Sequence, residues 1–407
     1  MHSRRVSTLA WPSSYGLNSS SLGLDPPEVV DWAEVDDVAT PSPVIPDYQG
    51  PNIRGIVPAL LGPGDWRTGL PAWMPDEVRN SRQAVLLVLD GLGWDQLQDH
   101  RHLLPTVASM NGGPITSVAP TTTATALSSI ATGLTPGEHG LIGYRVVLGG
   151  EILNVLRWCI GEADARRLHP PADVQPFPAF LGMAVPVISP AELQTSGFSV
   201  AHLRGSKPVG WRAASSIAVE VGYQLAAGER FVYAYYGGID KVAHERGFGD
   251  YYDAELRAAD RIVADVTEQL PPGAVLLVTA DHGQVHVGAN IVQPSKDLLS
   301  HVALQSGEGR FRWLHARRGG IPDLLAAAST ECSALAWVVT REQMLDEHWF
   351  GPTIAAPIAS RLGDVAIVAH QPVSYWDPAD SGPFELVCRH GSLTSAEVNV
   401  PLLATLR

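Results

Sequence analysis

Residues 84–90 read AVLLVLD, six apolar residues rich in valine and leucine followed by an aspartate. An unbroken apolar run of this length predicts a β-strand buried on both faces, as found in parallel sheets covered by helices. Two further runs have the same character, FVYAYY at 231–236 and AVLLVTAD at 274–281. The three runs therefore predict strands of one buried sheet.

Helix-like stretches lie between or after these runs, namely TATALSSIA (123–131), YYDAELRAADRIVADVTEQL (251–270) and PDLLAAAS (322–329). Strands that alternate with amphipathic helices predict an α/β fold with a mainly parallel central sheet flanked by helices on both faces. We expect four parts: an N-terminal tail or wrap (1–50), the core (51–290), a smaller inserted subdomain (291–375) and a return to the core (376–407).

The 407-residue chain is acidic, because 28 Lys and Arg oppose 42 Asp and Glu to give a formal net charge of −14. This balance argues against a general nucleic-acid binder, which needs basic surface to displace counterions from phosphates. No apolar run is long enough to predict a membrane span, and the N-terminal stretch lacks the apolar core of a secretory signal. Three widely spaced cysteines suggest a reducing compartment. We therefore expect a cytoplasmic protein.

Metal-type ligands stand at the end of each apolar run. Asp90 closes the first run, Asp281 and His282 close the third, and the second continues through two glycines to Asp240. His244 follows Asp240 by four residues, which puts both on one face if the segment is helical. In open α/β sheets, ligands bind beyond the carboxyl ends of the strands. One aspartate after a strand is usually a turn former, but three such strand ends together favour a binding site.

A further histidine, His390, stands near the C-terminus and precedes a glycine. Standing alone, it would more often be an ordinary surface or core histidine. With it, the candidate set is three carboxylates and three imidazoles, ligand types that zinc prefers and manganese accepts. The set is large enough for two divalent metal ions, with one position left for a nucleophile. Two such ions can clamp the attacking and leaving oxygens of a phosphoryl displacement.

The stretch APTTTATALSSIATGLTPGEHG (119–140) contains the nucleophile candidates. Threonines crowd the entry to a predicted helix that ends at Gly133, a suitable C-terminal cap. Free backbone N–H groups and the helix dipole favour an incoming phosphate there, although ordinary N-capping explains any single threonine. A threonine hydroxyl is a poor nucleophile unless a metal lowers its pKa. Three carboxylates and one alkoxide carry four negative charges, which two divalent metals balance.

Taken in order, these residues resemble the alkaline phosphatase superfamily, and within it the nucleotide pyrophosphatase/phosphodiesterase branch. The resemblance spans roughly residues 80–290 and 380–402. The matching motifs are VLDGLGWD with Asp90, the Pro-Thr-x-Thr…Thr-Gly-Leu…Pro…His-Gly segment, Asp-x-x-x-His at 240 and 244, Asp-His-Gly at 281–283 and His-Gly at 390–391. Aligned through Thr132-Gly133-Leu134, the family's nucleophilic threonine falls on Thr123, with Thr122 as the second choice.

The resemblance implies an alkaline phosphatase-like fold with two metal sites, one formed by Asp240, His244 and His390, the other by Asp90, Thr123, Asp281 and His282. It also implies that the Thr123 alkoxide attacks phosphorus and forms a phosphothreonine, which water then hydrolyses. In the phosphodiesterase branch an asparagine contacts the phosphate about twenty residues after the nucleophile. Tyr144 occupies that position here, so we expect Tyr144 to contact the substrate.

The expected function is therefore that of a phosphodiesterase or nucleotide pyrophosphatase that uses two zinc (or manganese) ions and takes a small phosphate ester or nucleotide as substrate. A phosphomonoesterase or phosphonate hydrolase with the same two metals stays open, as does a non-catalytic member that only binds metal or nucleotide. The Cys-x-Pro-x-Arg signature of sulfatases is absent around Thr123, which argues against sulfate esters. No third metal site or phosphate-binding arginine of alkaline phosphatase itself is evident, which favours diesters over monoesters. The oligomeric state is left open.

Four other polar residues lie near these motifs. His139 ends a tight turn, and we expect it to be structural. His286 lies four residues after His282 in a strand-end loop, where shared ligation is not expected. Lys241 and Arg389 flank metal-ligand candidates, and they are secondary candidates for contacting phosphate.

Overall fold

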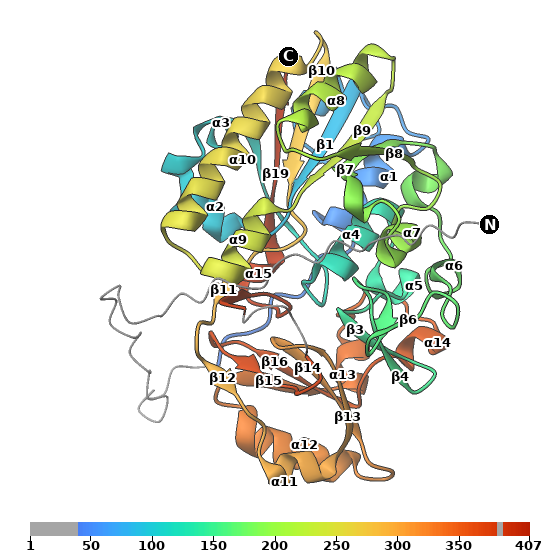
Figure 1. Cartoon of the computed structure of the whole chain (residues 1–407), viewed down its shortest axis with the longest axis vertical. Coiled ribbons are helices and arrows are strands. Elements are labelled where there is room, and N and C mark those ends of the chain that lie inside the picture. The colour runs from blue at the N-terminus through green and yellow to red at the C-terminus, as the bar shows by residue number, and fades with distance from the viewer. Residues whose placement is uncertain (1–39, 381–385) are drawn as a thin grey trace, which may run out of the picture. The chain divides into compact units, whose positions relative to one another are not determined.

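The structure, a computed structural model, describes residues 40–380 and 386–407, so residues 1–39 of the predicted tail lie outside the described residues. The central feature is a seven-stranded sheet (Figure 1). In spatial order its strands are β2 (Asn111–Thr116), β19 (Asn399–Leu406), β10 (Ala274–Thr279), β1 (Gln83–Leu89), β9 (Phe231–Tyr236), β7 (Pro186–Pro190) and β8 (Lys207–Trp211). The five strands from β10 to β8 pair in parallel, and β19 runs antiparallel to β10 and β2. The predicted α/β fold with a mainly parallel sheet is confirmed.

The three apolar runs form the middle of this sheet. β1 pairs with β10 on one side and with β9 on the other, so that Leu86 lies between Leu277 and Tyr233. Every residue of β1 after the first is buried, and so is every residue of β10. Helices cover both faces of such strands, which explains why their sequences do not alternate between apolar and polar residues.

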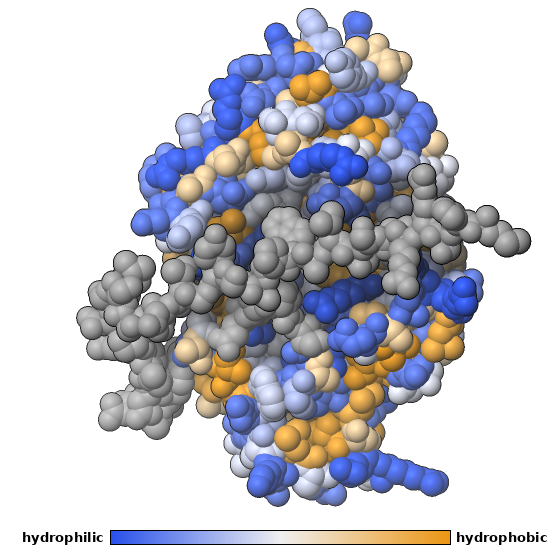
Figure 2. All heavy atoms as spheres, in the orientation of Figure 1, coloured by the Kyte–Doolittle hydropathy of each residue, from blue (hydrophilic) through white to orange (hydrophobic). Residues whose placement is uncertain are grey.

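Helices lie on either side of the sheet (Figure 1). One layer contains α8 (Ser216–Ala226), α9 (Gly238–Arg246) and α10 (Asp250–Gln269), and the other contains α1 (Ile56–Leu61), α4 (Thr123–Thr132) and α7 (Gly197–His202). α10 buries an apolar stripe that includes Leu256, Val263 and Val266. Its remaining residues are mainly charged, and Figure 2 shows a mostly hydrophilic surface over this part of the molecule. The amphipathic pattern of residues 251–270 therefore predicted this helix.

A second sheet of four antiparallel strands is formed within residues 302–369. Its strands are, in spatial order, β13 (Val302–Glu308), β14 (Phe311–Ala316), β16 (Val365–Ala369) and β15 (Ala336–Thr340). Three helices accompany it, α11 (Lys296–His301), α12 (Ile321–Cys332) and α13 (Arg341–Asp346). Aromatic residues, among them Phe311, Trp313 and Trp349, form a separate core on this sheet. The sheet lies inside the range predicted as an inserted subdomain, whose boundaries at 291 and 375 stay a prediction.

The other helices and strands are short. The helices are α2 (Trp94–Asp99), α3 (Pro105–Ala108), α5 (Pro136–His139), α6 (Pro171–Val174), α14 (Ala356–Ala359) and α15 (Ser395–Val398). A small antiparallel sheet contains β3 (Arg145–Leu148), β4 (Glu151–Asn154), β5 (Cys159–Ile160) and β6 (Ala163–Asp164). Two-residue strands pair as β11 (Val285–His286) with β18 (Cys388–Arg389), and β12 (Ile291–Val292) with β17 (Ser374–Tyr375). Within residues 40–380 and 386–407, no helix has both the length and the apolar character needed to cross a membrane.

A buried ion pair links the second sheet to the C-terminal segment. Nε and Nη2 of Arg310 each donate to one carboxylate oxygen of Glu397 at 2.8 Å, and both side chains are fully buried. The same carboxylate accepts hydrogen bonds from the Ser392 N–H at 3.0 Å and from the Thr394 hydroxyl at 2.6 Å. Glu397 therefore has its charge and its lone pairs satisfied only while the β13–β14 hairpin is docked.

We expect the substitution Arg310→Met to destabilise the fold by about 3–5 kcal/mol, because it leaves the Glu397 carboxylate buried without its cation. Urea unfolding followed by circular dichroism measures the effect. Arg166→Met is the matched control, since its partner Asp164 is exposed and the pair is screened by water. Equal and small effects of the two substitutions would contradict a structural role for the buried pair.

Candidate functional site

Parallel pairing brings the ends of β1, β9 and β10 to one edge of the central sheet. Asp90 follows β1 directly, and Asp281 and His282 come just after β10. The Asp90 N–H donates to the Tyr236 carbonyl at 3.0 Å, and the Asp240 N–H donates to the Asp90 carbonyl at 3.1 Å. The main chain therefore holds the aspartates of β1 and α9 next to each other before any side chain is considered.

Asp240, His244 and His390 form the outer of two ligand groups. Asp240 and His244 lie one turn apart on α9, as the spacing predicted for a helix, with His244 Nε2 3.2 Å from Asp240 Oδ1. His390 follows β18, and its Nε2 lies 3.2 Å from His244 Nε2 and 3.9 Å from Asp240 Oδ1. These three side chains are partly exposed, between 11% and 16%.

Asp90, Asp281 and His282 form the inner group, which is almost completely buried. His282 Nε2 lies 3.4 Å from Asp90 Oδ1 and 3.5 Å from Asp281 Oδ2. The rings of His282 and His390 stack at 3.6 Å between centroids, with 14° between their planes. This stack joins the inner group to the outer one, so the six ligand candidates form one continuous cluster.

The three histidines present the same nitrogen to the cluster. Nδ1 of His244, His282 and His390 lies 2.7, 3.0 and 2.7 Å from the carbonyl oxygens of Cys388, Gly283 and Thr121, respectively. Because a carbonyl oxygen only accepts, each Nδ1 carries the proton and each Nε2 presents a lone pair. Two such lone pairs that face each other at 3.2 Å repel, unless a proton or a metal ion lies between them.

The cluster fits divalent cations in distance and in charge. Atoms bound to a tetrahedral zinc at about 2.0–2.1 Å lie roughly 3.3 Å apart, close to the separations within both groups. Asp90 Oδ1 and Asp281 Oδ2 are buried without a hydrogen-bond partner in the described part of the chain. Burial, and then the charges of Asp281 and Asp240, raise the pKa of Asp90 well above its ordinary value. Bound cations would relieve both the burial and the repulsion.

Thr123 is the first residue of α4, and its hydroxyl lies at the inner group. Its Oγ1 is 3.1 Å from His282 Nε2. Thr122 has the extended backbone of an N-cap, and Gly133 ends the helix at φ +74°, as the sequence predicted. The N–H groups of the first turn have no acceptor within the helix, so this end of α4, where Thr123 stands, suits an anion. All seven predicted catalytic and metal positions thus lie together: Asp90, Thr123, Asp240, His244, Asp281, His282 and His390.

Tyr144 lies in a segment that is bound to α4. The N–H of the preceding residue, Gly143, donates to Thr125 Oγ1 at 2.9 Å. The Tyr144 hydroxyl accepts a hydrogen bond from Asn154 Nδ2 at 2.7 Å, which leaves its own hydrogen available for another acceptor. The expected contact of Tyr144 with substrate stays a prediction.

The two histidines expected to lie outside the cluster do so. His139 is buried, lies 2.9 Å from Ser129 Oγ and accepts the Leu141 N–H at 3.1 Å. Burial lowers the pKa of His139 to about 3, so it is a neutral structural residue. His286 lies in β11 with its side chain exposed, and it is not a member of either ligand group.

Two supporting residues were missed by the sequence analysis. The Tyr235 hydroxyl donates to Asp90 Oδ2, and the Gln284 amide donates to Asp240 Oδ1 at 3.0 Å. Tyr235 lies inside an apolar run. The sequence therefore does not indicate whether its hydroxyl binds a carboxylate or the ring simply packs in the core. Gln284 follows the Asp-His-Gly motif closely, but nothing in its spacing indicates which carboxylate it reaches.

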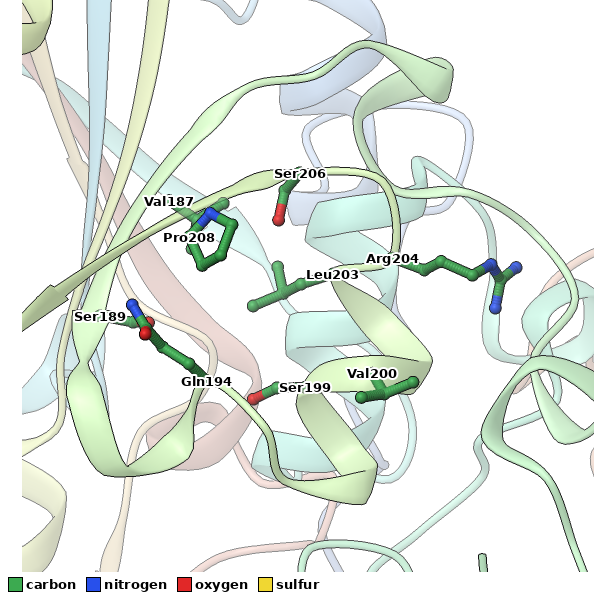
Figure 3. Close-up of a pocket in the computed structure, with 9 residues that line it drawn as sticks. All are labelled: Val187, Ser189, Gln194, Ser199, Val200, Leu203, Arg204, Ser206 and Pro208. Atoms are coloured by element: carbon green, nitrogen blue, oxygen red, sulfur yellow. The ribbon is translucent and has the colours of Figure 1, made fainter.

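A cavity of about 250 Å³ lies elsewhere, between β7, β8 and α7 (Figure 3). Its lining includes Ser189, Gln194, Ser199, Leu203 and Arg204. It contains none of the clustered residues and no carboxylate or imidazole. We therefore assign the chemistry to the cluster and not to this cavity.

Comparison with known proteins identifies the family. A sequence model of the type I phosphodiesterase / nucleotide pyrophosphatase family matches residues 84–211 and 211–346. The chain belongs to this family, and it has the fold of its phosphodiesterase- and pyrophosphatase-type hydrolases. No curated protein matches the chain.

Solved structures of the same fold include murine ectonucleotide pyrophosphatase / phosphodiesterase 5, with a TM-score of 0.57, 13% identity, and coverage of 79% of this chain and 87% of that one. Phosphonoacetate hydrolase from Sinorhizobium meliloti 1021, in complex with phosphonoacetate, gives a TM-score of 0.58, 16% identity, and coverage of 80% and 90%. At these identities the likeness establishes the fold. The superfamily indicated by the sequence motifs is confirmed.

The Tyr235 hydroxyl offers a test of the cluster that does not depend on catalysis. We expect Tyr235→Phe to weaken zinc binding about 10- to 100-fold, because Asp90 loses the donor that orients its carboxylate. Calorimetric titration of metal-free protein measures the affinity, with two zinc ions per chain expected for the unaltered protein. Tyr223→Phe, at a tyrosine that is 65% exposed, is the control. Unchanged zinc affinity in Tyr235→Phe would remove Tyr235 from the support of the site.

Proposed function

We propose that the chain is a metal-dependent phosphoric ester hydrolase that cleaves phosphodiester or nucleotide pyrophosphate bonds through a phosphothreonine on Thr123. The observation that carries this proposal is the 3.1 Å approach of the Thr123 hydroxyl to His282, a member of a cluster of three carboxylates and three imidazoles. A hydroxyl at a helix N-terminus beside metal-type ligands is the arrangement that nucleophilic phosphoryl transfer requires.

The two ligand groups each suit one divalent cation. In our proposal Asp240, His244 and His390 hold one, and Asp90, Asp281 and His282 hold the other together with Thr123. Zinc is the expected ion, and manganese accepts the same oxygen and nitrogen donors. Such cations, when bound, lower the pKa of a coordinated hydroxyl or water and neutralise charge on the transferred phosphoryl group.

Each residue of the site then has its own role in the proposed reaction. Thr123 Oγ1 forms the new bond to phosphorus as the bond to the leaving group breaks, and the N–H groups of the first turn of α4 face the equatorial oxygens. The ligand side chains of the inner group are buried, whereas Thr123 is partly exposed, so a substrate can reach its hydroxyl. The outer group is partly exposed, so it is the side from which water reaches the phosphothreonine.

Thr123→Ala should lower the hydrolysis of bis(p-nitrophenyl) phosphate by a factor on the order of 10³ or more, because it removes the nucleophile and leaves the ligands in place. Release of nitrophenolate measures the rate, and zinc content checks that the site still loads. Thr132→Ala, at the far end of the same helix, is the matched control. A wild-type rate in Thr123→Ala would exclude Thr123 from the mechanism, and loss of activity in Thr122→Ala alone would transfer the role to Thr122.

A phosphomonoesterase or phosphonate hydrolase is the second candidate function, supported by the structural likeness to phosphonoacetate hydrolase. For the leading candidate, the murine protein noted above has also been solved as an inactive variant in complex with AMP, which supports a nucleotide substrate. A non-catalytic, metal- or nucleotide-binding role is the third possibility. All three share the same cluster, so substrate preference must separate them.

Rates on four substrates discriminate between these functions: bis(p-nitrophenyl) phosphate, p-nitrophenyl phosphate, a dinucleoside pyrophosphate and phosphonoacetate. We expect kcat/KM for the diester or the pyrophosphate to exceed that for the monoester and the phosphonate at least about tenfold, a difference of roughly 1.4 kcal/mol in transition-state binding. A clear preference for the monoester or for phosphonoacetate would reverse the ranking. Full metal content without hydrolysis of any of the four would favour the non-catalytic role.

We also propose a cytoplasmic location. It rests on the three cysteines, Cys159, Cys332 and Cys388, which are all free thiols in the structure.

A further inference from the structure

Glu308 lies at the tip of the β13–β14 hairpin and has no part in the mechanism described above. Glu308 is only 9% exposed to solvent. Its Oε1 atom is buried and has no hydrogen-bond partner in the described part of the chain. Burying a carboxyl oxygen without a hydrogen-bond partner costs free energy. Such an atom in a folded protein therefore points to a bound ligand or to stored strain.

The surroundings of Glu308 belong to the proposed phosphoryl site. The Thr122 side chain lies close enough to the Glu308 carboxyl group to lower its pKa. A β-carbon at Gly391 would lie 2.8 Å from its Cγ and 3.1 Å from its Cδ, and a β-carbon at Gly143 would lie 4.0 Å from Oε1. The backbone at both glycines has positive φ, +127° at Gly391 and +115° at Gly143. The absence of a side chain at Gly391 is therefore what lets the carboxyl group approach this closely.

Each of these three neighbours stands next to a residue of the proposed site. Thr122 precedes the nucleophile Thr123, Gly391 follows the metal-ligand candidate His390, and Gly143 precedes Tyr144. Three separate segments thus place one carboxyl group beside the space that the nucleophile, the outer ligand group and the predicted substrate contact share. The docked position of the hairpin is held by the adjacent Arg310–Glu397 pair.

We propose, building on the proposed function, that Glu308 is a substrate-contacting residue whose carboxyl group donates a hydrogen bond to a non-bridging oxygen of the bound phosphoryl group. Those oxygens only accept hydrogen bonds, so the contact requires a protonated Glu308. The contact adds a neutral donor to the N–H groups of the first turn of α4, which would face oxygens of the same phosphoryl group. An ionised Glu308 would instead repel the phosphoryl group of any of the candidate substrates.

The charges around Glu308 are consistent with a protonated carboxyl group. Burial raises the pKa of Glu308 to about 8, whereas Thr122 and Arg312 lower it and Asp380 and Glu397 raise it. Arg312 is itself engaged by Asp377 and Asp380, so little of its charge is left for Glu308. Cations bound in the cluster lower the pKa further. We therefore expect Glu308 to lose its proton at or somewhat below pH 8, with loss of the donor.

The test compares Glu308→Gln, which keeps a donor of the same shape, with Glu308→Leu, which removes it. At pH 6.5, kcat/KM for bis(p-nitrophenyl) phosphate should stay within about threefold in Glu308→Gln and fall about 10- to 100-fold in Glu308→Leu. The wild-type decline in kcat/KM on the alkaline side should be absent from Glu308→Gln, because an amide does not ionise. Gln305→Leu, on the same strand, is the matched control for a polar-to-leucine change.

Binding of inorganic phosphate to the zinc-loaded protein, measured by calorimetry, gives a readout independent of turnover. We expect Glu308→Leu to weaken this binding about tenfold or more and Glu308→Gln to preserve it. Unchanged kcat/KM and phosphate affinity in Glu308→Leu would overturn the proposal. So would equal impairment of both variants with an unaltered pH profile, since that result indicates a structural role. If the protein hydrolyses no ester, the proposed hydrolase fails, and the phosphate affinities still decide whether Glu308 makes the contact.

Discussion

Repulsion among the carboxylates of Asp90, Asp240 and Asp281 is the constraint around which the rest of the molecule is arranged. Parallel pairing of β1 with β9 and β10 forces the aspartates that follow these strands to one edge of the sheet. Burial there removes the water that would screen them, so their mutual repulsion is strong and the pKa of Asp90 rises. Such a cluster persists only if cations or protons compensate it, and two groups of three side chains within it are placed so that each could hold a metal ion.

The cluster is supported unequally. The inner group sits on the ends of fully buried strands, and hydrogen bonds to its carboxylates come from the Tyr235 hydroxyl and from the N–H groups of Gly91 and His282. The outer group is carried by a helix and by a loop, and it is partly exposed to solvent. The inner carboxylates are therefore shielded from water and held by hydrogen bonds, whereas the outer group is open to solvent.

The second sheet contributes to this site without providing a ligand candidate. The tip of its β13–β14 hairpin carries Arg310, which clamps the segment around Ser392 through Glu397, and Glu308, which reaches Thr122 and Gly391. Two residues of the same hairpin tip thus anchor the second sheet and contact the segments around the cluster. This explains why a region with no metal-type motif is nevertheless fitted closely against the cluster.

The sequence by itself determined the α/β class, the three central strands, the helix that begins at Thr123 and the seven clustered positions. These features depend on local patterns, such as an apolar run or a ligand at a strand end, which can be recognised in the sequence itself. Only the tertiary structure decided that Tyr235 supports Asp90, that Gln284 reaches Asp240 and that Glu308 lies beside Thr122 and Gly391. Those contacts join segments that are far apart in the chain. The residues next to a tyrosine, a glutamine or a glutamate in the sequence do not indicate which distant residue its side chain contacts. Their selection depends on strand order, on helix packing and on the docking of a second sheet, which are properties of the folded chain as a whole.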